Sequence, residues 1–267
     1  MNVRGKATYV GSALLLLAAS FLAACGQGSR QDSAVASSAA DAQSEATATA
    51  QTPAYATVTV VIGDESPVDY TARIADWKAS GLVTEVRLLK KTVEQLAETG
   101  KHSPWFDTLA IIEFPNEEAY DAWAQRAPAD LGPQARIRRA DLLIHKEVNP
   151  RDAEKAYFAV NHYESLMPAE DYQAFSEKYI VPNMNGQMDA GLMTYYKMFL
   201  EREAEGVNPQ AVLVKEYVDR ESFEARKAVK DKNKEEVLLK DPEWARYNSI
   251  KTTLRTDLHE TLAREVK

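Results

Sequence analysis

The stretch TLAIIEFPNEEAYDA at residues 108–122 has a counterpart, AVLVKEYVDRESFEA, at residues 211–225. Each stretch begins with an apolar run that favours a buried strand, passes through a short polar turn, and ends in a segment that favours an amphipathic helix. The same strand–turn–helix order therefore occurs twice in one chain. Such self-similarity indicates an internal repeat.

Three further pairs of segments occur in the same order, and the spacing between matched segments stays between 102 and 116 residues. They are AYATVTVV (54–61) with AYFAVNHY (156–163), SGLVTEVRLLKK (80–91) with AGLMTYYKMFLE (190–201), and RADL (139–142) with RTDL (255–258). The first pair predicts a strand, the second a glycine turn leading into a strand, and the third a final strand. Between the first and second pairs, Asp69-Tyr70 and Asp171-Tyr172 open amphipathic helices. Chance similarity between two ordinary α+β units is the alternative interpretation.

Each repeat reads as β-α-β-β-α-β, the ferredoxin-like order. Two helices cover one face of such a sheet and leave the other bare, and an exposed apolar face costs about 25 cal/mol per Å². We therefore predict an α+β protein in which two tandem ferredoxin-like units, residues 54–150 and 151–267, pack sheet to sheet as a pseudo-dimeric α+β barrel. Because the partner sheet lies in the same chain, we expect a monomer.

This arrangement resembles the dimeric α+β-barrel superfamily over about 210 residues. The second unit also resembles NIPSNAP-like domains, through VDRESFEARKAV (218–229) followed by DPEW (241–244). The resemblance implies that haem-degrading and cofactor-free monooxygenases are relatives. In the haem-degrading members an asparagine on the first strand and a histidine on the second helix frame the cofactor. Asn161 fits the first role, but the second helices expected here contain no histidine, so we expect no cofactor.

The N-terminus carries Arg4 and Lys6 before an apolar run at residues 13–24. That run is shorter than the roughly 20 apolar residues of a transmembrane helix, and it suits the apolar region of a secretory signal peptide. The run ends in LAACG at residues 22–26, which resembles the lipobox of bacterial lipoproteins.

The lipobox resemblance implies that residues 1–24 are a signal peptide and that the thiol of Cys25 receives a lipid. The residue after Cys25 is Gly26 rather than an acidic residue, which resembles the sorting signal of outer-membrane lipoproteins in Gram-negative bacteria. We therefore expect a protein anchored to the bilayer at the cell envelope, on the outer membrane and facing the periplasm. The alternatives are an ordinary signal peptide with a chance cysteine and a retained transmembrane helix.

Residues 25–53 are expected to form a tether, because the stretch after Cys25 has no aromatic residue and a single valine. Such a segment cannot bury enough apolar area to offset the entropy of ordering it. As a flexible coil it would reach roughly 30 Å, enough to hold a domain just off a bilayer.

Composition excludes several classes of function. Cys25 is the only cysteine, so the remainder of the chain offers no disulfide, thiolate metal site or cysteine nucleophile. Removing Arg4 and Lys6 from the 32 basic residues leaves 30 from Cys25 onward, against 40 acidic residues. A body with this formal charge of −10 is a poor match for nucleic acid, because phosphate binding needs a basic face.

Period-two alternation divides each strand into two faces. We assign the consistently apolar set of the first strands to the helix-covered face: Ala56, Val58, Val60 and Ile62 in the first unit, Phe158 and Val160 in the second. The alternate set then faces the space between the sheets: Tyr55, Thr57 and Thr59, with Tyr157, Asn161 and Tyr163 in the second unit. In later strands the same alternation directs inward Glu85, Arg87 and Glu113, with Tyr195, Lys197 and Glu216 in the second unit.

The inward polar set of the second unit is the candidate ligand-binding surface: Tyr157, Asn161, Tyr163, Tyr195, Lys197 and Glu216. Tyrosines offer stacking area with a polar tip, and a Lys–Glu pair suits the orientation of a polar ligand. The alternative is that Glu85–Arg87 and Lys197–Glu216 are plain ion pairs between strands. This assignment places Lys215 on the helix-covered face, where a charged residue is unexpected. That placement warns that the strand assignment is shifted by one residue, because such a shift exchanges the two faces.

Catalytic motifs are absent from the sequence. The four histidines, at positions 102, 145, 162 and 259, form no metal-ligand spacing, and there is no nucleophile elbow, phosphate-binding glycine loop or dinucleotide fingerprint. We therefore assign no catalytic or metal-binding residue, and enzyme activity is left open, with binding favoured.

Three functions are compatible with these features. The leading one is a lipid-anchored, non-enzymatic module that binds a small organic ligand between its two sheets. The second is a cofactor-free monooxygenase-like or isomerase-like enzyme, which needs a cavity where a proton donor converges on Asn161. The third is a structural envelope protein that binds a protein partner through an exposed apolar patch near residues 242–254.

Overall fold

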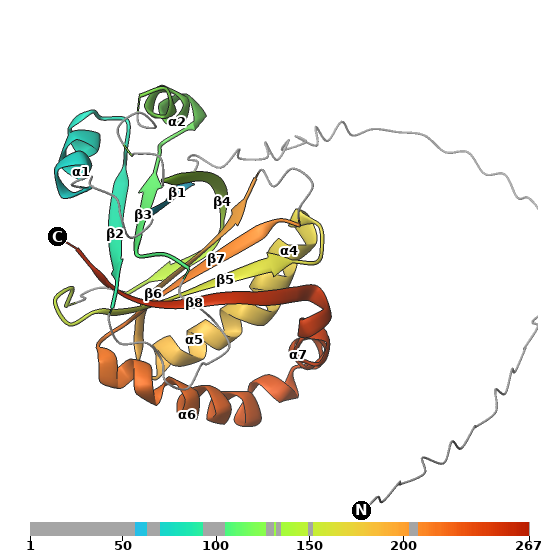
Figure 1. Ribbon diagram of the computed structural model, residues 1–267. Helices are drawn as coiled ribbons and strands as arrows, with labels where there is room; N and C mark the ends of the chain where they lie inside the picture. The colour runs from blue at the N-terminus through green and yellow to red at the C-terminus, as the bar shows by residue number, and fades with distance from the viewer. Residues whose placement is uncertain are drawn as a thin grey trace, which may run out of the picture. The chain divides into compact units, whose positions relative to one another are not determined.

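The computed structural model describes residues 57–62, 70–92, 105–126, 131, 135–148, 152–202 and 208–266 (Figure 1). All of them belong to a compact unit, Ala50–Lys267. The expected signal peptide, Cys25 and the tether lie outside the described residues. So do Tyr55 and Ala56, and the side chains of the first strand.

The first half of the compact unit follows the order β-α-β-β-α-β. Its elements are β1 (Thr57–Ile62), α1 (Tyr70–Ala79), β2 (Glu85–Lys91), β3 (Thr108–Glu113), α2 (Glu117–Ala124) and β4 (Arg136–Glu147).

The second half repeats that order with a larger helical layer. Its elements are β5 (Tyr157–Ser165), α4 (Ala169–Phe175), a π-helical segment (Ser176–Ile180), α5 (Val181–Asp189), β6 (Met193–Glu201), β7 (Gln210–Tyr217), α6 (Arg220–Glu236), a 3-10 turn (Leu238–Lys240), α7 (Pro242–Leu254) and β8 (Arg255–Glu265). The predicted α+β fold of two ferredoxin-like units is confirmed. None of the helices in the described part of the chain combines the length and the apolar composition of a transmembrane span.

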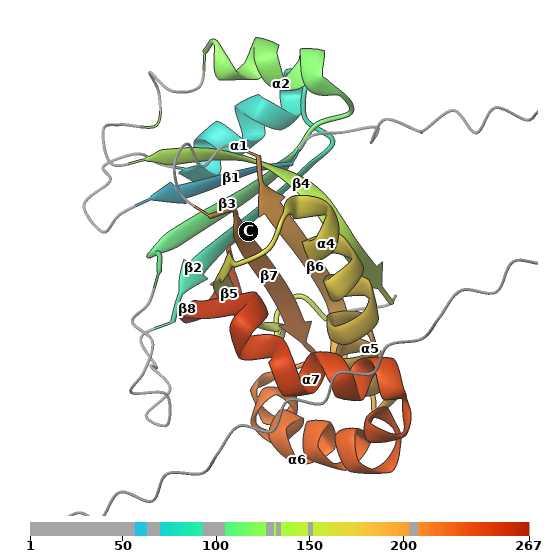
Figure 2. The ribbon, with the colours of Figure 1, turned by 90° about the vertical axis from the view of Figure 1, so that its right-hand side faces the viewer.

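The eight strands form one closed barrel in the order β1-β3-β2-β8-β5-β7-β6-β4. The first half contributes β4-β1-β3-β2 and the second β8-β5-β7-β6, so the two halves meet where β2 pairs with β8 and β4 pairs with β6. Each half thereby covers both edge strands of the other, which removes the unpaired edges that an open sheet exposes. Figures 1 and 2 show α1 and α2 on one side of the barrel and α4 to α7 on the other.

Matching turns explain why both halves fold alike. Gly81 and Gly191 have φ of 70° and 73° and occupy equivalent places between the first helix and second strand of each half. This left-handed backbone strains residues with a side chain, so glycine ends each helix. Asn116 and Asp219 cap α2 and α6 by accepting backbone N–H bonds from Ala119 and Ser222. The expected glycine turns are confirmed.

Three hydrophobic clusters hold the layers together. One lies under α1 and α2 around Trp77 and Trp123, and a second lies under the helices of the second half around Tyr172 and Trp244. The third, which we call the inner cluster, combines residues in or next to the strands of both halves and fills the middle of the barrel: Leu89, Phe106, Leu109, Ile111, Ala140, Ala156, Phe158, Val160, Tyr195, Phe199, Val212, Val214 and Ala263. Burial of both inner faces against each other is therefore confirmed.

Replacing Phe199 with alanine should lower the free energy of unfolding by about 3–5 kcal/mol, because its fully buried ring packs in the inner cluster. Urea unfolding followed by tryptophan fluorescence and circular dichroism should still give one shared transition. Leu239→Ala, at a residue that is 45% exposed, is the control and should leave the midpoint nearly unchanged. Two separate transitions would contradict a core shared between the halves.

Candidate ligand-binding site

Five charged side chains gather at one end of the barrel interior, and we call them the barrel-end network: Glu85, Arg87, Glu113, Lys197 and Glu216. They come from β2 and β3 of the first half and from β6 and β7 of the second. Their inward direction, and that of Tyr195, agrees with the sequence prediction.

The ion pairs of this network cross from one half of the protein to the other. Arg87 Nη1 lies 3.0 Å from Glu216 Oε2, and Lys197 Nζ lies 3.1 Å from Glu85 Oε2 and also bonds Glu113. The expected pair within the first half, Arg87 with Glu85, has an N–O distance of 3.3 Å.

These charges stabilise one another. Burial alone would raise the pKa of Glu85, but Lys197 and Arg87 outweigh that effect and hold it below its usual range. Burial would likewise lower the pKa of Lys197, yet Glu113 and Glu85 raise it. The guanidinium of Arg87 also stacks 4.2 Å from the ring centroid of Tyr195. The charges are paired, as the ion-pair interpretation expected, but Glu216 pairs with Arg87, and Lys197 pairs with Glu85 and Glu113.

The predicted faces of β5 are wrong. Phe158 and Val160 belong to the inner cluster, whereas Tyr157 and Tyr163 belong to the cluster under the second-half helices. The register explains the error, because Phe158 lies opposite the inward-facing Glu216 on β7 and opposite residues of an antiparallel pair share a face.

The six candidate residues therefore do not form one surface. Tyr195, Lys197 and Glu216 face the barrel interior, and the sheet separates them from Tyr157, Asn161 and Tyr163 on the helix side. Tyr157 packs against the ring of Phe223 in α6, at a centroid distance of 5.2 Å. Asn161 and Tyr163, by contrast, line a cavity.

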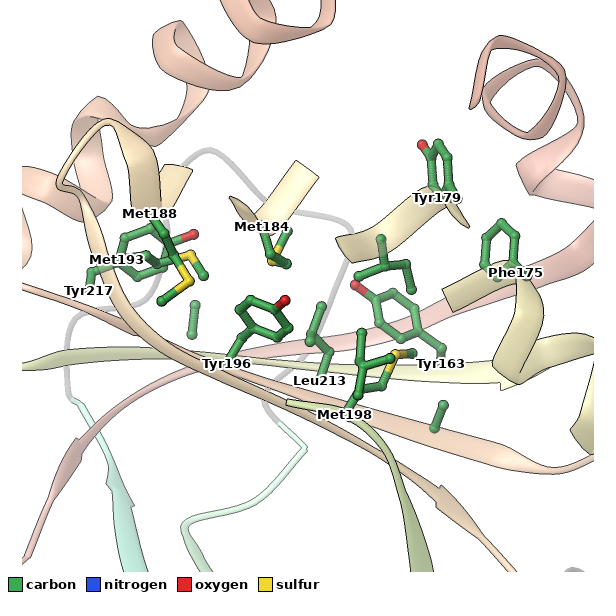
Figure 3. Packing of buried hydrophobic residues seen from close by; sticks show 14 of the residues in the cluster. Tyr163, Phe175, Tyr179, Met184, Met188, Met193, Tyr196, Met198, Leu213 and Tyr217 are labelled. Carbon is green, nitrogen blue, oxygen red and sulfur yellow. The ribbon is translucent and has the colours of Figure 1, made fainter. Parts of the chain in front are cut away.

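That cavity, which we call the helix-side cavity, has a volume of about 310 Å³ and lies between the second-half sheet and its helices. Figure 3 shows Tyr179 and Met184 approaching from the helices, opposite Tyr163 and Leu213 on the strands. Its lining is Asn161, Tyr163, Tyr179, Ile180, Asn183, Met184, Gln187, Leu213, Lys215, Tyr217, Arg226, Lys227, Lys230, Arg255, Asp257 and Glu260.

Positive charge predominates in this lining. Five basic residues face two acidic ones, although the whole chain carries a formal net charge of −8. Lys227 is exposed and Lys215 is buried, so the basic lining runs from the protein surface down to the sheet. A basic cavity in an acidic protein favours an anionic occupant.

Polar groups without a protein partner lie in the same lining. No described group donates a hydrogen bond to Asn161 Oδ1 or to Asn183 Oδ1, and both atoms are buried. Asn183 is 5% exposed and donates through Nδ2 to the carbonyl of Tyr179, 3.0 Å away. Gln187 Oε1 accepts the hydroxyl of Tyr217 at 3.1 Å. Buried polar atoms are usually satisfied, so these two oxygens suit a ligand or bound water.

Lys215 on β7 lies at the sheet side of the cavity. Its nearest carboxylate is that of Glu260 on β8, with a separation of 3.9 Å between Nζ and Oε1. Burial lowers the pKa of Lys215 to about 8; Glu260 opposes this effect, while Arg226, Lys230 and Arg255 add to it. The assignment of Lys215 to the helix face, which looked like a warning in the sequence, is correct.

A π-helical segment, Ser176–Ile180, joins α4 to α5 beside the cavity. Tyr179 and Ile180 in this segment both line the cavity. Such segments insert one extra residue into a helical turn and are frequent at functional sites.

The opposite end of the barrel interior holds His162. Its ring stacks on Trp105 at 4.2 Å, and its Nε2 lies 2.9 Å from Gln210 Oε1. Burial lowers its pKa to about 4; the bond to Gln210 opposes this effect, while His259 and Arg138 add to it. His162 is therefore neutral near pH 7 and part of the packing.

In the described part of the chain, no group of three or more acidic, histidine or cysteine side chains is placed to hold a metal ion.

Sequence reasoning missed the helical contribution to the cavity. Arg226, Lys227 and Lys230 recur at intervals of one and three residues on α6, which places them together on one helical face. That basic stripe follows Phe223, whose buried ring fixes which side of α6 faces the sheet. The basic stripe could have been recognised in the sequence. Its role as a cavity lining could be inferred only once the face of the sheet opposite α6 was known.

Comparison with known proteins gives similarity in structure alone. No family model and no curated protein matches the chain. Among solved structures, a proposed monooxygenase from Lactobacillus acidophilus has a TM-score of 0.46 at 10% identity, over 79% of this chain and 94% of that one. A proposed monooxygenase from Fusobacterium nucleatum has a TM-score of 0.47 at 12% identity, over 80% and 92%. A protein described as anthrone oxidase-like has a TM-score of 0.48 at 9% identity, over 80% and 91%.

Replacing Arg87 with methionine should lower the free energy of unfolding by about 3–5 kcal/mol, because it removes the guanidinium that neutralises the buried carboxylate of Glu216. Adding Glu216→Gln should restore a large part of that loss. Urea unfolding of the two single variants and the double variant measures the coupling. A double variant no more stable than Arg87→Met would show that the pair has no such role.

Proposed function

We propose that this protein binds a small anionic organic molecule in the helix-side cavity. One observation carries the proposal: a basic lining lies inside a protein that is acidic as a whole. The buried amide oxygens of Asn161 and Asn183 can accept a hydrogen bond from a donor group of the ligand or from a bound water. Anions are attracted to such a site by the local field, and amide groups fix their orientation.

The size and lining of the cavity limit the ligand. Its volume of about 310 Å³ is near the lower end of the range typical of small-molecule sites. Tyr163, Tyr179 and Tyr217 supply aromatic area, and Leu213 and Met184 supply apolar contacts. An acid with a compact aromatic or apolar body fits this combination. The proposed location differs from the space between the sheets that the sequence suggested, where the inner cluster packs.

Binding of a protein partner is the weaker alternative. Val237, Leu239 and Ile250 are exposed apolar residues in and beside α7, where the sequence suggested a patch. Isolated exposed apolar residues are ordinary on protein surfaces, however. The cavity is the stronger candidate because its buried polar groups lack partners.

We further propose that the protein is a lipoprotein of the bacterial cell envelope, anchored through Cys25. The support is the sequence alone: a short basic region, an apolar run and the LAACG motif at residues 22–26. A cavity protein held near a bilayer by a tether would meet its ligand in the envelope space.

Charge reversal in the cavity should weaken the binding of an anionic probe. For Lys227→Glu with Lys230→Glu we expect the affinity for 8-anilinonaphthalene-1-sulfonate to fall at least about tenfold, since each reversal changes the local energy by about 1 kcal/mol or more. Fluorescence titration measures it. Lys232→Glu with Lys240→Glu makes the same change in net charge away from the lining and is the control. Equal losses of affinity in both variants would refute a specific site.

Native mass spectrometry of the protein purified from its own host should reveal a retained small acid.

Replacing Cys25 with serine should abolish lipid attachment, because serine lacks the thiol that receives the lipid. In the bacterial host, the wild-type protein should incorporate an alkyne-tagged fatty acid and enter the detergent phase on Triton X-114 partition. The variant should do neither. Incorporation of label by the variant would disprove the anchor.

A further inference from the structure

Lys215 is placed differently from an ordinary structural lysine. Its side chain is 11% exposed, yet it lines the helix-side cavity rather than ending in a close ion pair. The 3.9 Å separation from Glu260 exceeds hydrogen-bond distance. Its amine therefore lies beside a carboxylate that can exchange protons with it over a small movement, and it faces a space large enough for a small molecule.

Groups from every surrounding element set the charge state of this amine. β8 contributes Glu260, Asp257 and Arg255, and α6 contributes Arg226, Lys227 and Lys230. The remaining polar groups of the lining, from β5, β7, α5 and the π-helical segment, are uncharged: Asn161, Tyr163, Tyr217, Asn183, Gln187 and Tyr179. Cations therefore outnumber carboxylates around Lys215. Burial, opposed by Glu260 and helped by these cations, lowers the pKa of Lys215 to about 8, which leaves a useful fraction of neutral amine near neutral pH.

We propose that Lys215 is a reactive amine that forms an imine with a carbonyl group of the anionic ligand. This inference rests on the proposed function, because it needs the helix-side cavity to be the ligand site. It deepens that function by naming the ligand class as an anionic aldehyde or ketone, and it gives the cavity a covalent step.

The step balances without any additional reactant. The lone pair of the neutral Nζ forms a bond to the carbonyl carbon while the C=O π electrons move to oxygen. The ammonium proton passes to that oxygen, and Glu260 is the nearest carboxylate available to carry it. The resulting carbinolamine loses water as the C=N bond forms. No oxidant or reductant takes part, and hydrolysis of the imine reverses the sequence.

Other cavity residues fit the two ends of such a ligand. The basic side chains of α6 and Arg255 suit its anionic group, while Lys215 lies deeper, against the sheet. An anionic group held by the α6 cations would leave the carbonyl at the deeper end to meet the amine. Glu260 is a positioning and proton-carrying residue in this arrangement.

The test is reductive trapping of the purified full-length protein with 4-formylbenzoate and cyanoborohydride, followed by peptide mapping. At pH 7 Lys215 should be labelled at least about tenfold faster than the exposed Lys240, because a larger fraction of its amine is neutral. The labelling rate of Lys215 should rise with pH and level off above about pH 8. Lys215→Arg should lose this fast labelling and keep its fold by circular dichroism; Lys215→Met serves as a second variant if the arginine form does not fold.

A ligand without a carbonyl separates the two proposals. 4-Methylbenzoate should bind the wild-type cavity and slow the labelling of Lys215. If it binds but Lys215 is labelled no faster than Lys240, the imine is refuted and the anion site stands. If neither compound binds, both proposals fail. Above about pH 8, where the amine of Lys215 is already mostly neutral, Glu260→Gln should slow labelling at least severalfold while 4-methylbenzoate still binds, and unchanged labelling there would remove Glu260 from the step.

Discussion

Closure of the barrel is the constraint on which the rest of the structure depends. Each ferredoxin-like half has an apolar inner face and two edge strands. Exposure of an apolar face to water is unfavourable, and an unpaired edge strand is open to pairing with other chains. Pairing of β2 with β8 and of β4 with β6 satisfies both needs at once. The inner cluster then packs from both halves, so the two repeats share one apolar core.

The closed sheet also divides the polar residues of the second half into two groups. Side chains that face inward can reach the other half, and there Arg87 and Lys197 of the barrel-end network pair with carboxylates across the barrel. Side chains that face outward lie under the helices, where no second sheet supplies partners. Asn161 Oδ1 and Asn183 Oδ1 are two buried polar atoms of this side that no described group donates to.

The helical layer of the second half creates the space in which those atoms lie. The first half covers its sheet with α1 and α2, whereas the second half adds α7 and a π-helical segment (Figure 2). Gly186 allows α5 to approach α6 closely, since a Cβ there would lie 2.1 Å from the side chain of Asn233. The two helices therefore pack closely against each other, and the basic stripe of α6 lines the cavity between them and the sheet.

Sequence by itself determined the repeat, the strand order along the chain and the matching turns, because these depend on local preferences such as positive φ at Gly81 and Gly191. It also predicted the inward direction of Arg87 and Lys197. Only the tertiary structure decided which face of β5 is inward. Residues 157–160 are all buried, so alternation between polar and apolar residues, which reports contact with water, carries no information there. The cavity could not be predicted from the sequence either. Its lining comes from several separate elements, and the packing between the sheet and the helices, rather than any one segment, brings them together.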